Sequence, residues 1–354
     1  MKNKMNKSTQ AGLWLFVLVA LCALTLRLAN AQKTDRPDDI PEGYTLIDGD
    51  ILLPTSVVES IRQQQMASPD ITPRATYRTN LWANGVVPFE FDANVTAANQ
   101  TNMLNAMAVL ENVANVDFQQ CAGNNCAGNY VHVQSSTGNN SQVGVVGGEQ
   151  VINIVSWGSQ FIIVHELQHC LGFFHEHTRP DRNTFVQINC NNVQGGCGGT
   201  IFNSNFVVPG DASAYGYYDF DSLQHYDQCS FSIDCAAGAT CGCANTVMTV
   251  LAPNQNQQTL IGQRDHLSAL DQATVSFLYP FGNWRFLDCT YNGSNGTSNG
   301  TFRRPYTTFN TAIANTPAGG TLWVLNDCFF PAIGTYSNQI TIRAAPGVTA
   351  TLGD

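Results

Sequence analysis

The stretch HELQHCLGFFHEH, residues 165–177, decides how this chain is interpreted. His165 and His169 are four residues apart, so on a helix they project from one face and can hold one metal ion together. Glu166 comes directly after the first histidine, which places its carboxylate beside such an ion and not on it. The apolar residues 161–164 precede the stretch and favour the helix that this geometry needs.

The second half of the stretch supplies a third ligand. Gly172 can adopt the left-handed conformation that ends a helix, and the chain can then turn and return His175 to the same ion. Three neutral imidazoles leave the fourth position of Zn²⁺ open to water, which is the pattern of catalytic zinc sites. Zinc lowers the pKa of that water towards roughly 7, and Glu166 can accept its proton and later protonate a leaving amine. We therefore expect one Zn²⁺ per chain and a peptide or protein substrate.

Two positions beyond the bare H-E-x-x-H make the motif more specific, because the shorter form also arises by chance. The extended pattern is that of the metzincins, and the residues around it are similar to the astacin family. Glu176 follows the third histidine, residues 177–182 read HTRPDR, residues 81–89 read LWANGVVPF, and residues 261–264 read IGQR. The resemblance runs from Leu81 to Tyr279. It implies an α+β fold of the metzincin (astacin-like) type and zinc-dependent endopeptidase activity.

A second motif of the family lies at residues 218–226, which read YDFDSLQHY. The resemblance implies that Tyr226 is a further zinc ligand, which swings away and helps to stabilise the negatively charged oxygen of the reacting carbonyl. Gln224 stands where the family has a methionine, a soft apolar floor beneath the zinc site. Met248 is the alternative floor, although no tyrosine lies two residues after it.

Latency is implied by residues 47–51, IDGDI, which resemble a motif of astacin pro-peptides. By that resemblance Asp50 binds the zinc in place of the water and keeps the precursor inactive. A Gly-Asp turn in a flexible linker is the simpler alternative. A cut after Arg74, or at Arg78, would release the domain. The freed amino terminus is then implied to reach Glu176, in a structural role.

The amino-terminal residues predict export. A basic start is followed by an apolar run from about Gly12 to Leu24 and by the small-x-small pattern at residues 29–31. The run is too short for a comfortable membrane span, so we expect a secreted protein with no membrane segment after signal removal. We predict a signal peptide at 1–31, a pro-segment at 32–74, a zinc peptidase domain at 75–281 and a carboxyl-terminal β-rich segment at 282–354.

Regular structure is expected mainly in the first half of the domain. Sequence patterns predict strands at Val86 to Phe91, Tyr130–Val133 and Val151–Val155. Helical spacing through Leu104, Met107 and Leu110 predicts a helix at Thr101 to Val113, and a second helix is expected from near Ser159 to Phe173. In residues 282–354 a short helix at Tyr306 to Asn315 and strands at residues 321–325 and 340–343 are expected. This small all-β segment resembles the start of a parallel β-helix, or else a β-sandwich-like appendage.

Cysteine spacing predicts disulfides, as expected of an exported protein. Close pairs are Cys121 with Cys126 and Cys190 with Cys197, and Cys289 with Cys328 can close a longer loop. The pairing within Cys229, Cys235, Cys241 and Cys243 is open, and a cysteine metal site there is the alternative. Cys170 is left over as a buried free thiol.

Net charge excludes one class of partner, and two other functions compete with the peptidase prediction. The formal net charge of −10 argues against a nucleic-acid partner, because few cations are present to displace counterions. One competing function is a catalytically inactive zinc-binding or adhesion protein that keeps the fold. The other is a polysaccharide-directed segment at 282–354. Glu166 and Tyr226 favour a peptidase, since a binding module needs no general base.

Overall fold

The structure, a computed structural model, describes residues 40–47, 50–56, 58–59, 77, 80–206, 208, 216–235, 241–330, 337 and 339–352. The chain divides into the units Met1–Pro41 and Glu42–Asp354, and the features below belong to the second. The predicted signal peptide and the cleavage sites at Arg74 and Arg78 lie outside the described residues. Within the described residues, no helix has the length and apolar character needed to cross a membrane.

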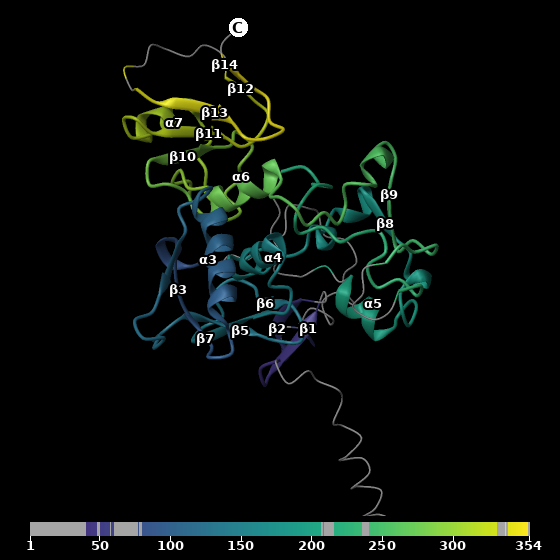
Figure 1. Cartoon of the computed structure of the whole chain (residues 1–354). Helices are drawn as coiled ribbons and strands as arrows, with labels where there is room; N and C mark the ends of the chain where they lie inside the picture. The colour runs from purple at the N-terminus through teal and green to yellow at the C-terminus, as the bar shows by residue number, and fades with distance from the viewer. Residues whose placement is uncertain are drawn as a thin grey trace, which may run out of the picture. The chain divides into compact units, whose positions relative to one another are not determined.

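A mixed sheet, seven-stranded over the described residues, forms the amino-terminal part of the unit (Figure 1). In spatial order its strands are β1 (Tyr44–Ile47), β2 (Ile51–Pro54), β6 (Asn140–Gln142), β7 (Glu149–Ile154), β5 (Tyr130–Ser135), β3 (Val86–Phe91) and β4 (Asp117–Gln120). Neighbouring strands are parallel except for β1–β2 and β6–β7. The strands predicted at 86–91, 130–133 and 151–155 are therefore confirmed, the last two with shifted ends.

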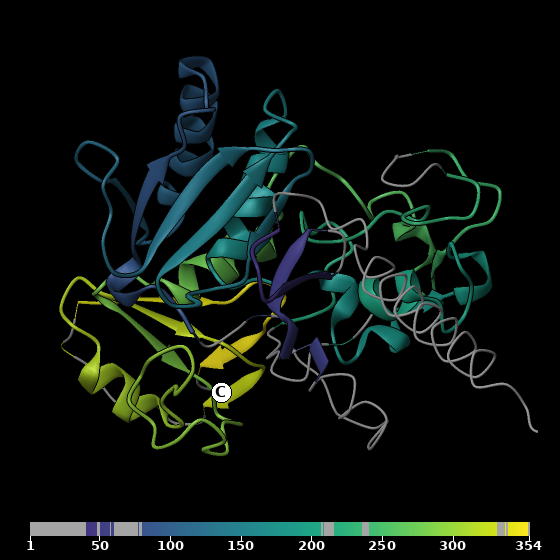
Figure 2. The ribbon, with the colours of Figure 1, turned by 90° about the horizontal axis from the view of Figure 1, so that it is seen from below.

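Two helices, α3 (Ala97–Glu111) and α4 (Gln160–Cys170), pack together on one face of this sheet (Figure 2). The Thr96 side chain caps α3 by accepting from the backbone N–H of Asn99. Met103, Met107 and Leu110 of α3 are buried at helical spacing. Leu104 was expected in the same row and is 45% exposed, because it lies one position, about 100° of helix rotation, from Met103.

The β1–β2 hairpin extends the sheet with residues of the predicted pro-segment, in which no strand was expected. β2 pairs in parallel with β6, and the backbone N–H of Ser141 donates to the carbonyl of Asp50 at 2.8 Å. Ile47, Ile51 and Leu53 are buried in a small core. The hairpin therefore holds Asp50 at a fixed place beside α4.

Beyond α4 the chain is mostly irregular, as predicted. In this half β8 (Val186–Ile188) pairs antiparallel with β9 (Met248–Val250), and two helices are present, α5 (Thr200–Asn205) and α6 (Ala269–Leu278). Short 3-10 turns lie at Glu176–Thr178, Arg182–Thr184, Cys190–Asn192 and Gln255–Gln257. A further 3-10 turn, Ala83–Gly85, precedes β3 in the first half. Tyr226, Val186 and Met248 belong to one buried cluster in this half.

Disulfides link cysteines in the sheet region, in the irregular half and in the carboxyl-terminal segment. The predicted bonds Cys121–Cys126, Cys190–Cys197 and Cys289–Cys328 are confirmed. The open cluster resolves as Cys229–Cys243 and Cys235–Cys241, which excludes a thiolate metal site there. Cys170 is the buried free cysteine among the described residues.

The carboxyl-terminal segment is built from short parallel ladders. β10 (Trp284–Leu287), β11 (Thr321–Val324) and β13 (Thr341–Ala344) form one, and β12 (Cys328–Phe330) pairs with β14 (Ala350–Leu352) in the other. One helix, α7 (Phe309–Asn315), accompanies them where the sequence predicts a helical stretch. Stacked parallel strands are what coils of a β-helix require; the β-helix itself stays a prediction.

Candidate metal centre

Helix α4 presents the first two histidines and stops where the third must return. The backbone N–H of Gly172 donates to the carbonyl of His169 at 2.8 Å, and that of Phe173 to the carbonyl of Gln168 at 3.0 Å. Gly172 has φ 109°, a conformation that a residue with a Cβ rarely adopts. This helix-ending motif redirects the chain so that His175 comes back toward α4, as expected from the sequence.

The three histidines and Asp50 converge on one point. The ring Nε2 atoms of His169 and His175 lie 3.1 and 3.3 Å from Nε2 of His165. The Asp50 carboxylate lies 3.1 Å from Nε2 of His165 and 3.1 Å from Nε2 of His175. Together they form a group whose candidate ligand atoms all lie within 4.8 Å of one another.

The hydrogen bonds of the histidines show that this cluster fits a cation. Nδ1–H of His165 donates to the carbonyl of Leu223 at 2.9 Å, and Nδ1–H of His169 donates to the carbonyl of Phe173 at 2.7 Å. A neutral imidazole that donates through Nδ1 carries a lone pair on Nε2. Lone pairs of His165 and His169 therefore face each other at 3.1 Å, which is repulsive unless a positive ion lies between them. Outer hydrogen bonds of this kind orient metal-binding histidines.

Burial favours the neutral form of the His165 and His169 imidazoles. Burial and then the positive charge of Arg264 lower the pKa of His165 to about 4. Burial lowers the pKa of His169 well below its ordinary value. Arg264 is fixed by a hydrogen bond from Nη1 to the carbonyl of His225 at 2.9 Å. Neutral nitrogens are the form that binds a metal.

Glu166 is buried next to His165 in α4 but is not one of the four residues whose candidate ligand atoms converge. It is 1% exposed, and its Oε2 has no hydrogen-bond partner among the described residues. Burial and then the negative charge of Asp50 raise the pKa of Glu166 well above that of an ordinary carboxyl group. A buried carboxylate beside a metal position, with one oxygen uncommitted, has the placement that a general base needs.

Tyr226 lies next to the third histidine. Its ring centroid is 4.6 Å from that of His175, and its ring stacks on His177 with centroids 4.0 Å apart. The His177 ring is held in turn by the carbonyl of Asn205, 3.1 Å from Nε2. The structure thus brings Tyr226 to the site, as the sequence motif suggested.

Gln224, and not Met248, lies beneath the histidines. Nε2 of Gln224 donates to the carbonyl of His165 at 3.0 Å and to Oε1 of Gln168 at 3.1 Å. Met248 is in β9, paired opposite Ile188. The floor of this site is therefore polar in this chain.

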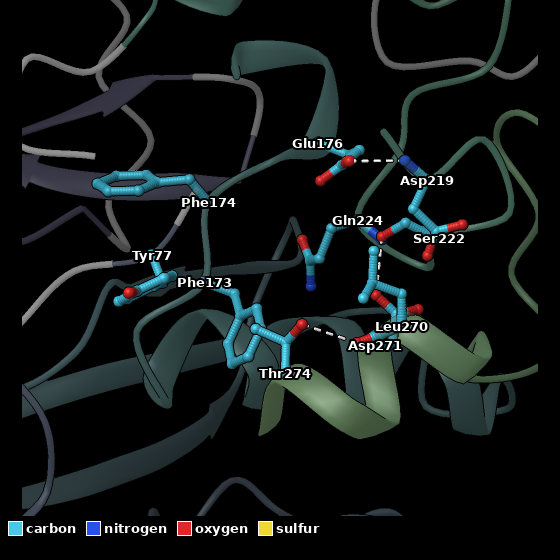
Figure 3. Close-up of a pocket in the computed structure, with 10 residues that line it drawn as sticks. All are labelled: Tyr77, Phe173, Phe174, Glu176, Asp219, Ser222, Gln224, Leu270, Asp271 and Thr274. Atoms are coloured by element: carbon cyan, nitrogen blue, oxygen red, sulfur yellow. Dashed lines mark hydrogen bonds between the residues drawn. The ribbon is translucent and has the colours of Figure 1, made fainter. Parts of the chain in front are cut away.

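A small cavity lies behind the floor and is rich in acid groups (Figure 3). About 20 Å³ is available to the centre of a water molecule, and one water needs about 10–15 Å³ by that measure. Glu176 accepts from the backbone N–H of Asp219 at 2.8 Å and from Arg179 at 3.1 Å. Burial raises the pKa of Glu176 to about 8. Burial, and then the charge of Asp219, raise the pKa of Asp271 to about 7. The remaining residues that line the cavity are Tyr77, Phe173, Phe174, Ser222, Gln224, Leu270 and Thr274.

Sequence reasoning assigned no role to Gln168, His177, Arg264 or Asp271. Gln168 sits inside the zinc motif, three residues after His165, and its helical spacing is the signal that could have placed it on the same side of the helix as His165. Arg264 belongs to the IGQR stretch, but nothing local in that stretch indicates that it approaches His165. Such contacts depend on how distant loops pack.

Comparison with known proteins covers the same region. Residues 74–280 match the family model described as Astacin, a peptidase family. The chain is 28% identical over 270 residues to "Zinc metalloproteinase nas-14" of Caenorhabditis elegans, covering 72% of this chain and 50% of that protein. It is 34% identical over 215 residues to "Tolloid-like protein 1" of Mus musculus, covering 58% of this chain and 20% of that protein.

A solved structure also resembles the chain. High choriolytic enzyme 1, a hatching enzyme zinc-protease from Oryzias latipes, is 28% identical, with a TM-score of 0.47, and the match covers 57% of this chain and 94% of that one. The chain spans half or less of the length of the two curated relatives.

Proposed function

The chain belongs to the astacin family of peptidases, and we propose on that premise that it is a zinc-dependent endopeptidase made as a latent precursor. The observation that carries the proposal is the convergence of His165, His169 and His175 beside the buried Glu166, whose Oε2 has no hydrogen-bond partner in the described part of the chain. Peptides or proteins are the substrates of a peptidase family. A binding protein with the same fold would have no use for Glu166.

The three histidines would hold one Zn²⁺, which supplies a Lewis acid that polarises water and the peptide carbonyl. Glu166 takes a proton from the attacking water and returns it to the leaving amine nitrogen. Tyr226, beside His175, donates a hydrogen bond to the carbonyl oxygen as negative charge develops on it. Leu223 and Phe173 keep the His165 and His169 rings oriented through their carbonyls.

We attribute latency to Asp50. Its carboxylate lies within 3.1 Å of both His165 and His175, in the place where a water and a substrate carbonyl must enter. The hairpin β1–β2 that carries it is anchored to the sheet by pairing with β6. A carboxylate held there excludes the reacting water, so the precursor is inactive until the pro-segment is released.

Release would leave an amino terminus near the acidic cavity. Tyr77, three residues after Arg74, lines that cavity together with Glu176, Asp219 and Asp271. An ammonium group there would offset buried negative charge, and Glu176 is the partner that the family resemblance implies. We also infer secretion, which is supported by the amino-terminal sequence and by disulfides such as Cys229–Cys243.

Substituting Glu166 tests the catalytic assignment. Glu166→Gln in the chain cut near Arg74 should retain one zinc per chain and lose roughly 10²–10⁴-fold in kcat, because the proton acceptor is gone. Activity of the unsubstituted chain should vanish with a chelator and return with Zn²⁺. Glu149→Gln is the matched control, since Glu149 is exposed and accepts from Tyr130 on the sheet. Unchanged turnover in Glu166→Gln would refute the mechanism, and zinc binding without any peptidase activity in the unsubstituted chain would favour the binding-protein alternative.

A further inference from the structure

Gln168 and Gln224 form a buried polar pair beneath the three histidines, and we propose that this pair positions the zinc ligands. Gln168 lies in α4 between His165 and His169, and it is 0% exposed. Gln224 is 2% exposed and reaches α4 from the opposite loop. The two side chains meet through the hydrogen bond from Nε2 of Gln224 to Oε1 of Gln168 at 3.1 Å.

The orientation of the Gln224 amide is fixed by its first partner. Only a donor can bond the carbonyl of His165, so Nε2 and not Oε1 lies at 3.0 Å from that oxygen. The second N–H of the same group then points to Gln168. Both donors of Gln224 are used, and both bonds end on the turn of α4 that carries His165 and His169.

The backbone around Gln224 reaches the remaining ligands. Its carbonyl accepts from the backbone N–H of Glu176 at 3.0 Å, next to His175. The preceding residue, Leu223, accepts from Nδ1–H of His165. The dipeptide Leu223–Gln224 therefore forms hydrogen bonds to three places: the His165 imidazole, the turn of α4 that carries His165 and His169, and the backbone next to His175.

A space-filling role does not account for this pair. Gln224 Oε1 and Gln168 Nε2 are buried and have no hydrogen-bond partner among the described residues. Unpaired buried polar groups are unfavourable, and an apolar pair of similar size would avoid that cost. Gln224 also lines the acidic cavity, with its side chain extending into the cavity (Figure 3). The polar pair is explained by the bonds that it makes to α4.

The pair should behave as a unit. Replacing Gln224 alone by methionine leaves both ends of the Gln168 amide without a partner among the residues that the structure describes. Replacing Gln168 alone leaves one N–H of Gln224 without its acceptor. Replacing both removes the unsatisfied groups together. Residues in one hydrogen-bonded pair give non-additive effects, whereas independent packing residues give additive ones.

Zinc release from the full chain is the measurement. Gln224→Met and Gln168→Met should each weaken zinc retention against a chelator by about 10–100-fold, as when an outer hydrogen bond to a metal site is lost. The double variant should lose no more than the worse single variant. After the cut near Arg74, each single variant should lower kcat more than it raises KM. Gln258→Met is the matched control, because Gln258 bonds both Val250 and Met248 in β9; it should lower the unfolding temperature without changing zinc release.

Two results would overturn the inference. Single variants with unchanged zinc release would show that the pair does not position ligands, and a double variant that loses the product of both single effects would show that the two residues act separately. The inference rests on zinc binding by the three histidines. If the unsubstituted chain bound no zinc, the proposed function would fail first; if it bound zinc and the variants were additive, only the role of the pair would fail.

Discussion

Single side chains around His175 have separable tasks in this site. Tyr226 touches His175 through its ring and stacks on His177, so its ring contributes packing, while its hydroxyl is the group to which we assign a part in the reaction. Glu166 is buried with one free oxygen among the described residues, and Asp50 faces the histidine nitrogens. Each of these three groups can be removed by a substitution that leaves the ligands in place.

Tyr226→Phe should lower kcat by roughly 10–1,000-fold, because the hydrogen bond to the developing oxyanion is lost. KM should change little, since the effect is on the transition state. Phenylalanine keeps the ring that stacks on His177, so zinc content and stability should stay close to those of the unsubstituted chain. Steady-state kinetics of the cleaved chain, with Tyr130→Phe as a surface control, gives the comparison. An unchanged kcat would place the Tyr226 hydroxyl outside the reaction.

The residues of the zinc motif are predictable from sequence because their spacing is local. His165 and His169 share a helix face, and Gly172 ends that helix with a positive φ, so the return of His175 follows from the chain itself. The pairing of Gln224 with Gln168 is not predictable in this way. It joins residues 56 positions apart, and only the packing of the loop under α4 brings them together.

At the level of elements, helix α6 connects the carboxyl-terminal core to the metal centre. It begins with a capping box in which Ser268 and Asp271 bond each other's backbone N–H groups. Asp271 also accepts from the Ser222 hydroxyl and from the backbone N–H of Leu223, both at 2.8 Å. Since the Leu223 carbonyl accepts from His165, this helix end helps to fix a metal ligand.

The raised pKa of Asp271 predicts a pH-dependent stability. Its folded pKa of about 7 lies above the ordinary value of 3.8, so between these pH values the folded chain keeps a proton that the unfolded chain releases. Unfolding then becomes easier as pH rises. The free energy of unfolding of the unsubstituted chain, relative to that of Asp271→Asn, should fall from about pH 4 to about pH 7 by at most roughly 1.4 kcal/mol per unit.

Urea unfolding of the zinc-free chain and of the Asn variant across that range measures this difference. Asparagine cannot ionise, so its curve carries the pH dependence of every other group and serves as the reference. A relative stability that stays flat would mean that Asp271 ionises normally in the fold. A relative stability that rises with pH would mean that the three hydrogen bonds to the Asp271 carboxylate lower its pKa more than burial raises it.

Strands and helices are predictable where their period is clear. Val86–Phe91 alternates between intermediate and buried residues, and α3 buries Met107 and Leu110 as its spacing indicates. The hairpin β1–β2 was not expected, because its strands YTLI and ILLP are only four residues long. The apolar runs on either side of residues 48–50, DGD, are the signal that could have indicated it.

Across the whole described unit, the core does not stop at the predicted domain boundary of residue 281. Phe277 of α6 contacts Trp284, Phe286 and Trp323 with ring centroids 5.0–6.3 Å apart. These residues belong with the buried side chains of α3 and α4 to one cluster. The boundary remains a prediction, but the packing implies that the peptidase region and residues 282–354 stabilise each other.

The described residues of the predicted pro-segment, in β1 and β2, are likewise part of the folded unit. β2 is bonded to β6, and Ile51 and Leu53 share a core with Phe174, next to His175. Two explanations of latency therefore compete at this scale. Asp50 can silence the site through its carboxylate, or the hairpin can silence it by covering the three histidines whatever residue stands at position 50.

The activity of uncut Asp50→Ala tests most directly whether one metal centre serves both proteolysis and latency. The account predicts measurable hydrolysis of a short peptide by this precursor, loss of that hydrolysis with a chelator, and faster zinc release than from the unsubstituted precursor. Asp48→Ala, two residues away in the same segment, should stay as inactive as the unsubstituted precursor. An Asp50→Ala precursor that remained silent until a cut near Arg74, with zinc release unchanged, would contradict the account.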